Sequence, residues 1–402
     1  MARQFVDSYL EHVHGGCHTI FHPASLRLQV RAGTVKKAIL YAVCAMGSKF
    51  SANADERALE AGLSAEAKRL FQEDLENICI ENVQVSLLLA TLSSGNCCPC
   101  SEALYVRIAT GIAEILRLGS TQSDVEGDDV ISQETSRRIW GSLYVAERWS
   151  FSGLGLRCRM DDVDSLNHVV KAAVEDTLFY SPSTASQTVA DSDGKPGLWA
   201  SMITLTGHFG PIQDFNRQIA KGGLSAPDVA QRVATLGRNL DNWLQSLPLD
   251  LQLSATNLDR SLQNSLAKSL TSLHLTYHFL STLLYFHSLE EQRGPDAGQR
   301  HDCEYIVRCK YHAGSFSSLL SHHRQVTGAE INHSTIGHMV VVSSSVLVHT
   351  LLFGDVHELP EARQKLNSNF DVLTRLGRYW PAVQAMVVFL MHYRRRQNTG
   401  VS

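Results

Sequence analysis

Proline is scarce in this chain, and the patterns that mark β-structure are missing. Only 10 of the 402 residues are proline, and no segment shows a clean apolar–polar alternation bounded by hairpin turns. Because proline breaks helix interiors, its scarcity favours helices over a loop-rich fold. We therefore predict an all-α fold, formed by a single large multihelical domain over residues 1–402.

The chain also lacks a strong excess of either charge. It has 36 Lys and Arg against 40 Asp and Glu, for a formal net charge of −4. A domain that holds a nucleic-acid backbone by itself carries a basic surface, so the composition gives no strong nucleic-acid footprint. We interpret the one basic run, Arg394-Arg395-Arg396, as a solvated helix end, with nuclear import or nucleic-acid contact as the weaker alternative.

Long uninterrupted apolar runs are absent as well. The longest stretch, Ile336–Phe353, is broken by glycine, serine and histidine, which is typical of a buried helix and not of a membrane span. The N-terminus has no apolar signal core. The nine cysteines are odd in number and scattered, so we predict a reducing intracellular compartment with mostly buried or inert thiols.

Nucleophile and phosphate motifs do not occur. No G-x-S-x-G elbow is present. Gly194-Lys195 is followed by Pro196, which removes an amide that a phosphate loop needs. Gly153-Leu154-Gly155 resembles the start of a dinucleotide fingerprint, but no strand precedes it. The sequence therefore indicates no catalytic residue, and we predict that the chain is not an enzyme.

Candidate metal-binding motifs are present only in incomplete form. The turn Cys97-Cys98-Pro99-Cys100 lacks a second cysteine pair at finger spacing. His274 and His278 share a helix face without the glutamate of an H-E-x-x-H site. Asp161-Asp162-Val163-Asp164 lacks the glycine of a calcium loop, and acidic residues are favourable at a helix start. We predict no metal and no cofactor for this chain.

Helical periodicity is what the sequence does contain, and it covers most of its length. Residues 181–197 are small, polar and turn-rich, so they are predicted to be a surface loop or linker. The segments with helical spacing are 3–14, 24–50, 54–79, 83–92, 102–118, 198–220, 225–247, 258–289, 303–320, 333–353, 361–377 and 381–393. Gly119 is predicted to cap the helix over 102–118.

The stretch Glu134–Asn167 is the most informative part of the sequence. It begins as an amphipathic helix with Ile139, Leu143 and Ala146 on one face and Trp140 beside them. Its remaining features are four charges, a glycine-containing turn and an acidic exit, namely Arg137, Arg138, Glu147 and Arg148, then residues 152–156, then Asp161–Asp164. We interpret this stretch as a packing centre held by ion pairs.

The same residues resemble the central signature of the fungal-specific transcription factor domain, the middle homology region of fungal zinc-cluster regulators. That pattern has an arginine pair, a hydrophobe and tryptophan, an acid–arginine pair, a turn glycine and an acidic stretch. Residues 9–26, 94–119, 236–248, 275–286 and 379–381 resemble further elements of the family in its order. The residues that the resemblance marks as a structural and regulatory signature are Arg137, Arg138, Trp140, Glu147, Arg148, Gly155, Asp162 and Asp164.

Two departures accompany the resemblance. The family often has tryptophan where Gly141 stands, and Arg-Pro where Leu156-Arg157 stand. Its DNA-reading module, six cysteines on two zinc ions, has no counterpart in this sequence, so the zinc implied by the family would belong to a segment that is not present. The chain is a truncated gene model, a fragment, or a regulator that acts without its own DNA contact.

The resemblance implies transcription regulation in a fungus, in the nucleus and with shuttling to the cytoplasm left open. The implied partners are a homodimer mate or a full-length zinc-cluster regulator, the transcription machinery, and a small-molecule effector. DNA would be reached only through a segment not present, and no membrane is expected. The alternatives are a helical small-molecule-binding protein or enzyme with an apolar pocket, for which the acidic run 161–164 half fits a terpenoid-type motif, and a scaffolding dimer partner.

Overall fold

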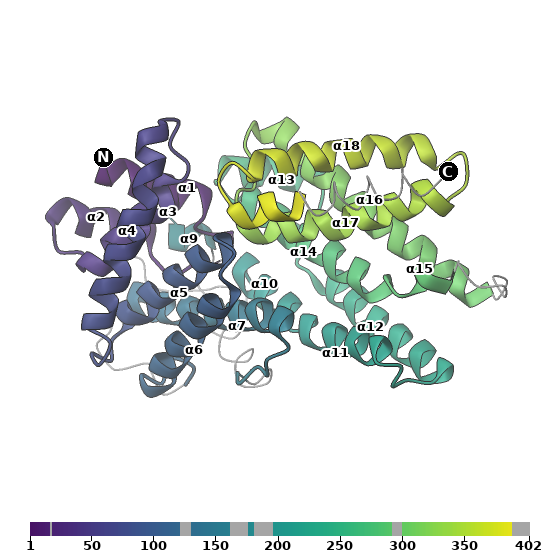
Figure 1. Cartoon of the computed structure of the whole chain (residues 1–402), viewed down its shortest axis with the longest axis horizontal. Helices are drawn as coiled ribbons and strands as arrows, with labels where there is room; N and C mark the ends of the chain where they lie inside the picture. Colours follow the sequence, from purple (N-terminus) through teal and green to yellow (C-terminus); the bar gives the residue numbers. More distant parts are fainter. Residues whose placement is uncertain (17, 121–129, 161–175, 181–195, 292–299, 388–402) are drawn as a thin grey trace. The chain divides into compact units, whose positions relative to one another are not determined.

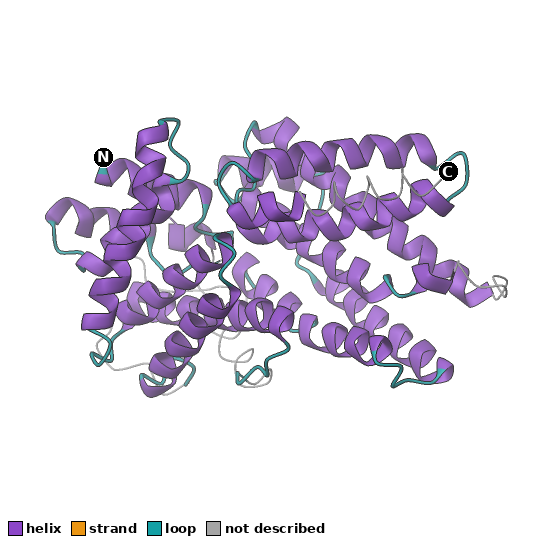
Figure 2. Cartoon of the chain, viewed as in Figure 1, coloured by secondary structure: helices purple, strands orange, loops and turns teal. Residues whose placement is uncertain are grey.

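The computed structural model describes residues 1–16, 18–120, 130–160, 176–180, 196–291 and 300–387. Helices make up most of these ranges, as Figure 2 shows. Within them the only β-type pairing is an isolated bridge between His14 and His18. The all-α prediction is therefore confirmed.

The chain divides into two compact units, Met1–Thr204 and Leu205–Ser402, and each is described by itself. The prediction that residues 1–402 form one domain stays a prediction. The predicted loop over 181–197 lies outside the described residues except for its last two positions.

Unit 1 contains the stretch Glu134–Asn167. Its helices, labelled in Figure 1, are α1 (Ala2–His12), α2 (Pro23–Ala32), α3 (Lys37–Ser48), α4 (Ala54–Glu73), α5 (Ile80–Gly95), α6 (Pro99–Ile115), α7 (Val130–Leu154), α9 (Asp176–Tyr180) and α10 (Leu198–Thr206). Local chemistry fixes several of their starts. His22 caps α2, its ring nitrogen accepting from the Ser25 amide with Pro23 at the first helical position, and Asn53 caps α4 by accepting from the Asp55 amide.

Tertiary contacts in unit 1 shorten one predicted helix. The periodic segment 54–79 ends as a helix at Glu73, because the chain turns there to place Asp74 against the ammonium of Lys36. The same ammonium donates to Asn82 Oδ1 at 2.9 Å. An ion pair made with a distant residue thus sets an end that periodicity alone does not show.

Unit 2 consists of a second set of helices. They are α11 (Phe209–Ala220), α12 (Ala226–Ser246), the 3-10 turn η2 (Leu249–Leu251), α13 (Ala255–Gln263), α14 (Ala267–Tyr285), α15 (Ser288–Glu291), α16 (Arg300–Thr327), α17 (Ser334–Phe353) and α18 (Leu359–Leu376), with residues 381–387 also helical. Helix α14 packs on α16, and α17 packs on α18. The buried residues of α14 come from all sides of the helix, so it lies at the centre of the unit 2 core.

Helix α17 is long and apolar enough to cross a membrane, and 56% of its apolar window is buried within the structure. Its serines make polar contacts with neighbouring helices. Ser343 Oγ lies 2.9 Å from Ser317 Oγ of α16, and Asn369 of α18 donates to Ser344 Oγ at 3.1 Å. These contacts support the interpretation of α17 as a core helix.

The prediction that Gly119 caps the helix over 102–118 is wrong. Helix α6 ends at Ile115, and Arg117 takes the left-handed conformation there with φ of 56°. The amides of Arg117 and Leu118 donate to Glu114 O and Ala113 O at 3.0 and 3.1 Å, which is a Schellman ending. Gly119 comes after this cap and has a packing role.

Candidate functional site

Helix α7 presents a long buried face. Ile139, Leu143, Tyr144 and Phe151 on this helix are all fully buried. The helix continues through Ser152 and Gly153, which the sequence predicts to be a turn. The chain leaves it at Gly155, whose φ of +65° lies in the left-handed region that favours glycine.

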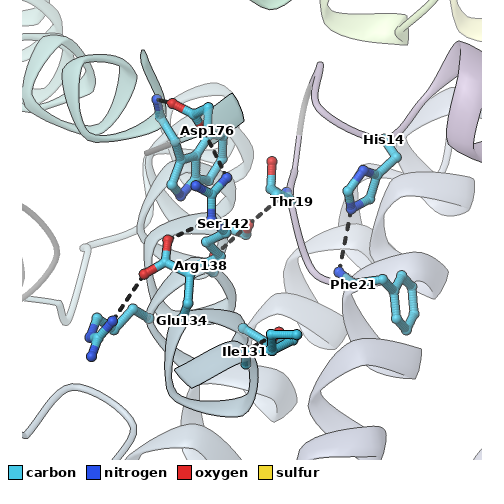
Figure 3. A network of polar contacts seen from close by, with 11 residues as sticks. His14, Thr19, Phe21, Ile131, Glu134, Arg138, Ser142 and Asp176 are labelled. Atoms are coloured by element: carbon cyan, nitrogen blue, oxygen red, sulfur yellow. Dashed lines mark hydrogen bonds and ion pairs between the residues drawn. The ribbon is translucent and has the colours of Figure 1, made fainter. Parts of the chain in front are cut away.

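Near the start of α7, Arg138 is the centre of a buried ion-pair network. Its side chain is 1% exposed, its Nε donates to Glu134 Oε1 at 2.6 Å, and its Nη1 lies 2.9 Å from Asp176 Oδ1 of α9. The neighbouring Arg137 donates from Nη1 to the other oxygen of Glu134 at 3.0 Å. Figure 3 shows Arg138 between the two carboxylates. We call these four residues the Arg138 network.

The Arg138 network connects three helices of unit 1. Asp176 also accepts the backbone amide of Trp199 in α10 at 3.1 Å, and the Arg138 guanidinium lies 4.0 Å from the ring centroid of Phe179 in α9. Burial alone would lower the pKa of Arg138, but the charges of Asp176 and Glu134 outweigh it and hold that pKa above its ordinary value. The arginine is therefore a permanent buried cation.

The segment before α2 is tied to the same part of α7. The Thr19 amide donates to Ser142 Oγ at 3.0 Å, and this hydroxyl donates to Arg138 O at 2.7 Å. His14 Nε2 accepts the Phe21 amide at 3.4 Å within the same segment (Figure 3). The contacts of α7 thus reach the N-terminal part of the chain.

A second network, the Glu147 network, lies two to three turns further along α7. Glu147 is fully buried, and its Oε1 accepts from Arg107 Nη1 of α6 and from the Arg159 amide, both at 2.9 Å. Its Oε2 accepts the Met160 amide at 3.0 Å. A single carboxylate therefore holds the chain that follows α7 against α6.

Arg148 contacts the same segment. Its Nη2 donates to Met160 O at 3.2 Å, and its guanidinium lies 3.4 Å from the ring centroid of Tyr144. Glu147 and Arg148 are adjacent in sequence, but the contacts described for them are with other partners. The acid–arginine pair thus holds residues 159 and 160.

Close packing around helix α7 explains two glycines. A Cβ atom at Gly119 would lie 2.4 Å from Cε2 of the Trp140 ring. A Cβ atom at Gly141 would lie 3.1 Å from Cδ1 of Ile203 and 3.2 Å from Nε1 of Trp199, both in α10. The family departure at Gly141 therefore has a physical reason, because α10 fills the space that a larger side chain would need.

Known proteins similar to this chain include a family and one curated relative. A family model for the fungal specific transcription factor domain matches residues 6–166. This part of the chain is therefore similar to members of that family. An uncharacterized transcriptional regulatory protein of Schizosaccharomyces pombe is 24% identical over 311 residues, which is 69% of this chain and 31% of the relative. The chain thus spans about a third of that relative's length. No solved structure matches.

Within the matched residues 6–166, the structure brings part of the predicted signature together. Arg137 and Arg138 share one network, and Glu147 and Arg148 hold one segment. Trp140 packs on Gly119, and Gly155 forms the turn that ends α7. The predicted signature residues Asp162 and Asp164 lie outside the described residues. The regulatory role of all these residues stays a prediction.

Sequence reasoning missed three residues of the two networks. Glu134 was detectable, because it stands four positions before Arg138 on the same helix face. Asp176 and Arg107 lie on other helices, and no local pattern marks them. Within the described part of the chain, no group of three or more His, Cys, Asp or Glu residues is placed to hold a metal ion.

Proposed function

We propose that this chain is the regulatory region of a fungal transcription regulator. Support comes from the family match over residues 6–166 and from the relative, which is named as a transcriptional regulatory protein. The sequence has no six-cysteine cluster. DNA contact is therefore assigned to another segment or to a partner regulator, and this chain is assigned the control of that activity.

The observation that carries this proposal is Arg138, which lies buried between Glu134 and Asp176. A buried ion pair adds little net stability, but removing one partner is costly because the other charge is left uncompensated. A buried arginine of this kind therefore favours the one arrangement of helices that keeps both carboxylates beside it. We infer that the Arg138 network sets how α7, α9 and α10 pack, and that regulation acts through this arrangement.

The finer parts of the proposal follow from the family. The chain would work in the nucleus, together with the transcription machinery and with either a second copy or a full-length zinc-cluster regulator. A small-molecule effector would act by favouring one packing of the helices. These assignments rest on the family match and on no contact in the structure.

A tethering assay tests the proposal. The full chain is fused to an unrelated DNA-binding module in yeast, and output is read from a reporter with and without the matching operator. We expect the fusion to change reporter output several-fold at the operator, and Arg138→Ala to remove most of that change.

Arg27→Ala is the matched control, because Arg27 forms an exposed ion pair with Asp7 in the same unit. It should leave the reporter at the level of the unaltered fusion, with equal protein abundance confirmed by immunoblot. A fusion that never alters the reporter and never associates with chromatin in its own host would contradict a regulatory role. Loss of output in both variants would contradict the role of the Arg138 network.

A further inference from the structure

Three thiols lie at the surface in the turn between α5 and α6. Cys97, Cys98 and Cys100 are free and exposed, whereas Cys44 and Cys309 are buried in the cores of their units. Free cysteine is among the most buried residue types in proteins. Three exposed thiols within four residues therefore need an explanation that packing does not supply.

The backbone of this turn holds Cys97 in an unfavourable conformation. The amides of Cys97 and Cys98 donate to Ser94 O and Ser93 O at 3.3 and 2.9 Å, which is a Schellman ending of α5. Cys97 takes the left-handed position of this motif with φ of 60°. Glycine is favoured there, and another residue costs roughly 1–2 kcal/mol. Because glycine would be more favourable at this position, we infer that the cysteine side chains of the turn have a role of their own.

The next two thiols lie close together along the chain. Cys98 is the N-cap of α6, Pro99 follows at the first helical position, and Cys100 is the next residue. Helix geometry places Cα atoms two residues apart at about 5.4 Å, which lies within the range of about 4.4–6.8 Å that disulfides span. Helical side chains two positions apart point to opposite sides, so closing a bond requires the first turn of α6 to rotate.

We propose that Cys98 and Cys100 form an oxidative modification site, at which a hydroperoxide converts the two thiols to a disulfide. One thiol sulfur attacks the peroxide, the O–O bond breaks, and a sulfenic acid forms with release of water or an alcohol. The second sulfur attacks the sulfenic sulfur, the S–O bond breaks, and water leaves with the thiol proton. Two thiols lose two electrons, and the peroxide gains them.

The first turn of α6 is connected to the Glu147 network. Glu102, one turn after Cys98, accepts a hydrogen bond from Ser150 of α7 at 2.6 Å. Further along the same helix, Arg107 pairs with Glu147. Rotation of the first turn therefore pulls on the contacts between α6 and α7. Oxidation at the turn is expected to loosen the second half of α7 without touching the Arg138 network.

Peptide mass spectrometry on the full chain tests the site. The protein is treated with limiting hydrogen peroxide, its remaining thiols are alkylated, and the peptide containing residues 97–100 is analysed. We expect this peptide to lose two hydrogen atoms and to recover its mass with dithiothreitol. Cys98→Ser and Cys100→Ser should each abolish the change, and Cys97→Ser should retain it.

Cys158→Ala is the matched control, because Cys158 is exposed but lies outside this turn, and it should leave the disulfide unchanged. Melting curves confirm that each variant folds, with alanine replacing serine where it does not. A peptide that only gains oxygen atoms overturns the proposal. A disulfide that survives Cys100→Ser and is lost in Cys97→Ser overturns the assigned pair.

Hydrogen exchange tests the link to α7. In the oxidised protein, amides in the second half of α7 should exchange at least several-fold faster than in the reduced protein, and Cys100→Ser should abolish the difference. Unchanged exchange after complete disulfide formation would overturn the coupling. Both readouts are independent of transcription, so their failure is distinguishable from failure of the reporter assay.

Discussion

Helix α7 in unit 1 and helices α14 and α16 in unit 2 bury polar groups of different kinds. Helix α7 of unit 1 buries full charges, with Arg138 between carboxylates and Glu147 on an arginine and two amides. The core of unit 2 buries neutral groups, and the Nδ1 atoms of His278 and His312 lie 3.0 Å apart between α14 and α16. In the same unit His323 Nδ1 lies 2.9 Å from the hydroxyl of Thr271.

This difference changes what each unit responds to. A buried arginine keeps its charge, so its environment must always supply carboxylates and the helix packing is fixed by them. A buried imidazole is tolerated because it is neutral, so its environment fails when the ring takes up a proton. Helix α7 is therefore expected to respond most to substitution of its charges, and helices α14 and α16 to acidification.

The largest expected effect is loss of the Arg138 charge. Arg138→Ala leaves Glu134 and Asp176 buried without their cation, which should lower the free energy of unfolding of unit 1 by about 3–5 kcal/mol. Chemical denaturation followed by hydrogen exchange of α7 amides measures the loss and assigns it to unit 1. Arg27→Ala removes an exposed pair and should cost less than about 1 kcal/mol. Equal losses in the two variants would remove the distinction between buried and exposed charges.

Acidification should have the next largest effect, on unit 2. Burial lowers the pKa of His278 to about 3, helped by the nearby His312 and His274, and it lowers the pKa of His312 to about 4. For His312, Asp241 opposes the shift and Arg308 adds to it. The unfolded chain thus takes up protons near pH 6.5, before the folded chain does, so stability is lost as pH falls below 6.5.

A shift of this size corresponds to about 2 kcal/mol for one histidine between pH 7 and pH 5. Hydrogen exchange of α14 and α16 amides over that range should report the loss. Hydrogen exchange of α7 amides over the same range serves as the comparison. His312→Gln should remove only the part of this pH dependence that His312 contributes, because His278 and His323 keep their lowered pKa values. An unchanged dependence in that variant would assign the protons elsewhere.

The sequence predicts the helices of these regions better than the contacts between residues that are distant in the chain. Helical spacing predicts most helices because a buried apolar face repeats at the period of the helix. It does not place the end of α4 at Glu73, because the Lys36–Asp74 contact that ends the helix joins distant residues. Asp176 escapes prediction for the same reason, whereas Glu134 stands at helical spacing from Arg138.

Gly119 shows a second limit. A glycine after a periodic helix predicts a C-cap, yet the cap is made by Arg117 and the glycine is needed for the Trp140 ring. Gly119→Ala should therefore cost about 1–3 kcal/mol through overpacking, as measured by the melting temperature of unit 1. Gly111→Ala on α6 is the control, because a Cβ atom there meets nothing within 4 Å. That change should stabilise the helix by up to about 1 kcal/mol. A loss of stability in Gly111→Ala would show that another surface packs against α6 at this position.

The smallest effect tests whether unit 1 also contains a half-buried acid that prefers to be neutral. Burial raises the pKa of Glu102, against the hydrogen bonds from Ser150 and Ser94. The folded chain therefore holds this proton more tightly than the unfolded chain, and stability falls as pH rises through the ordinary carboxyl range. Glu102→Gln keeps an acceptor for Ser150 and removes the charge. It should raise the free energy of unfolding at pH 7 by less than about 1 kcal/mol, and the gain should vanish in acid, where the carboxyl is protonated in both states.

Glu114→Gln is the control, because Glu114 is exposed on the same helix, and it should change nothing at either pH. A loss of stability in Glu102→Gln at pH 7 would instead make Glu102 a required charge, as Glu147 is.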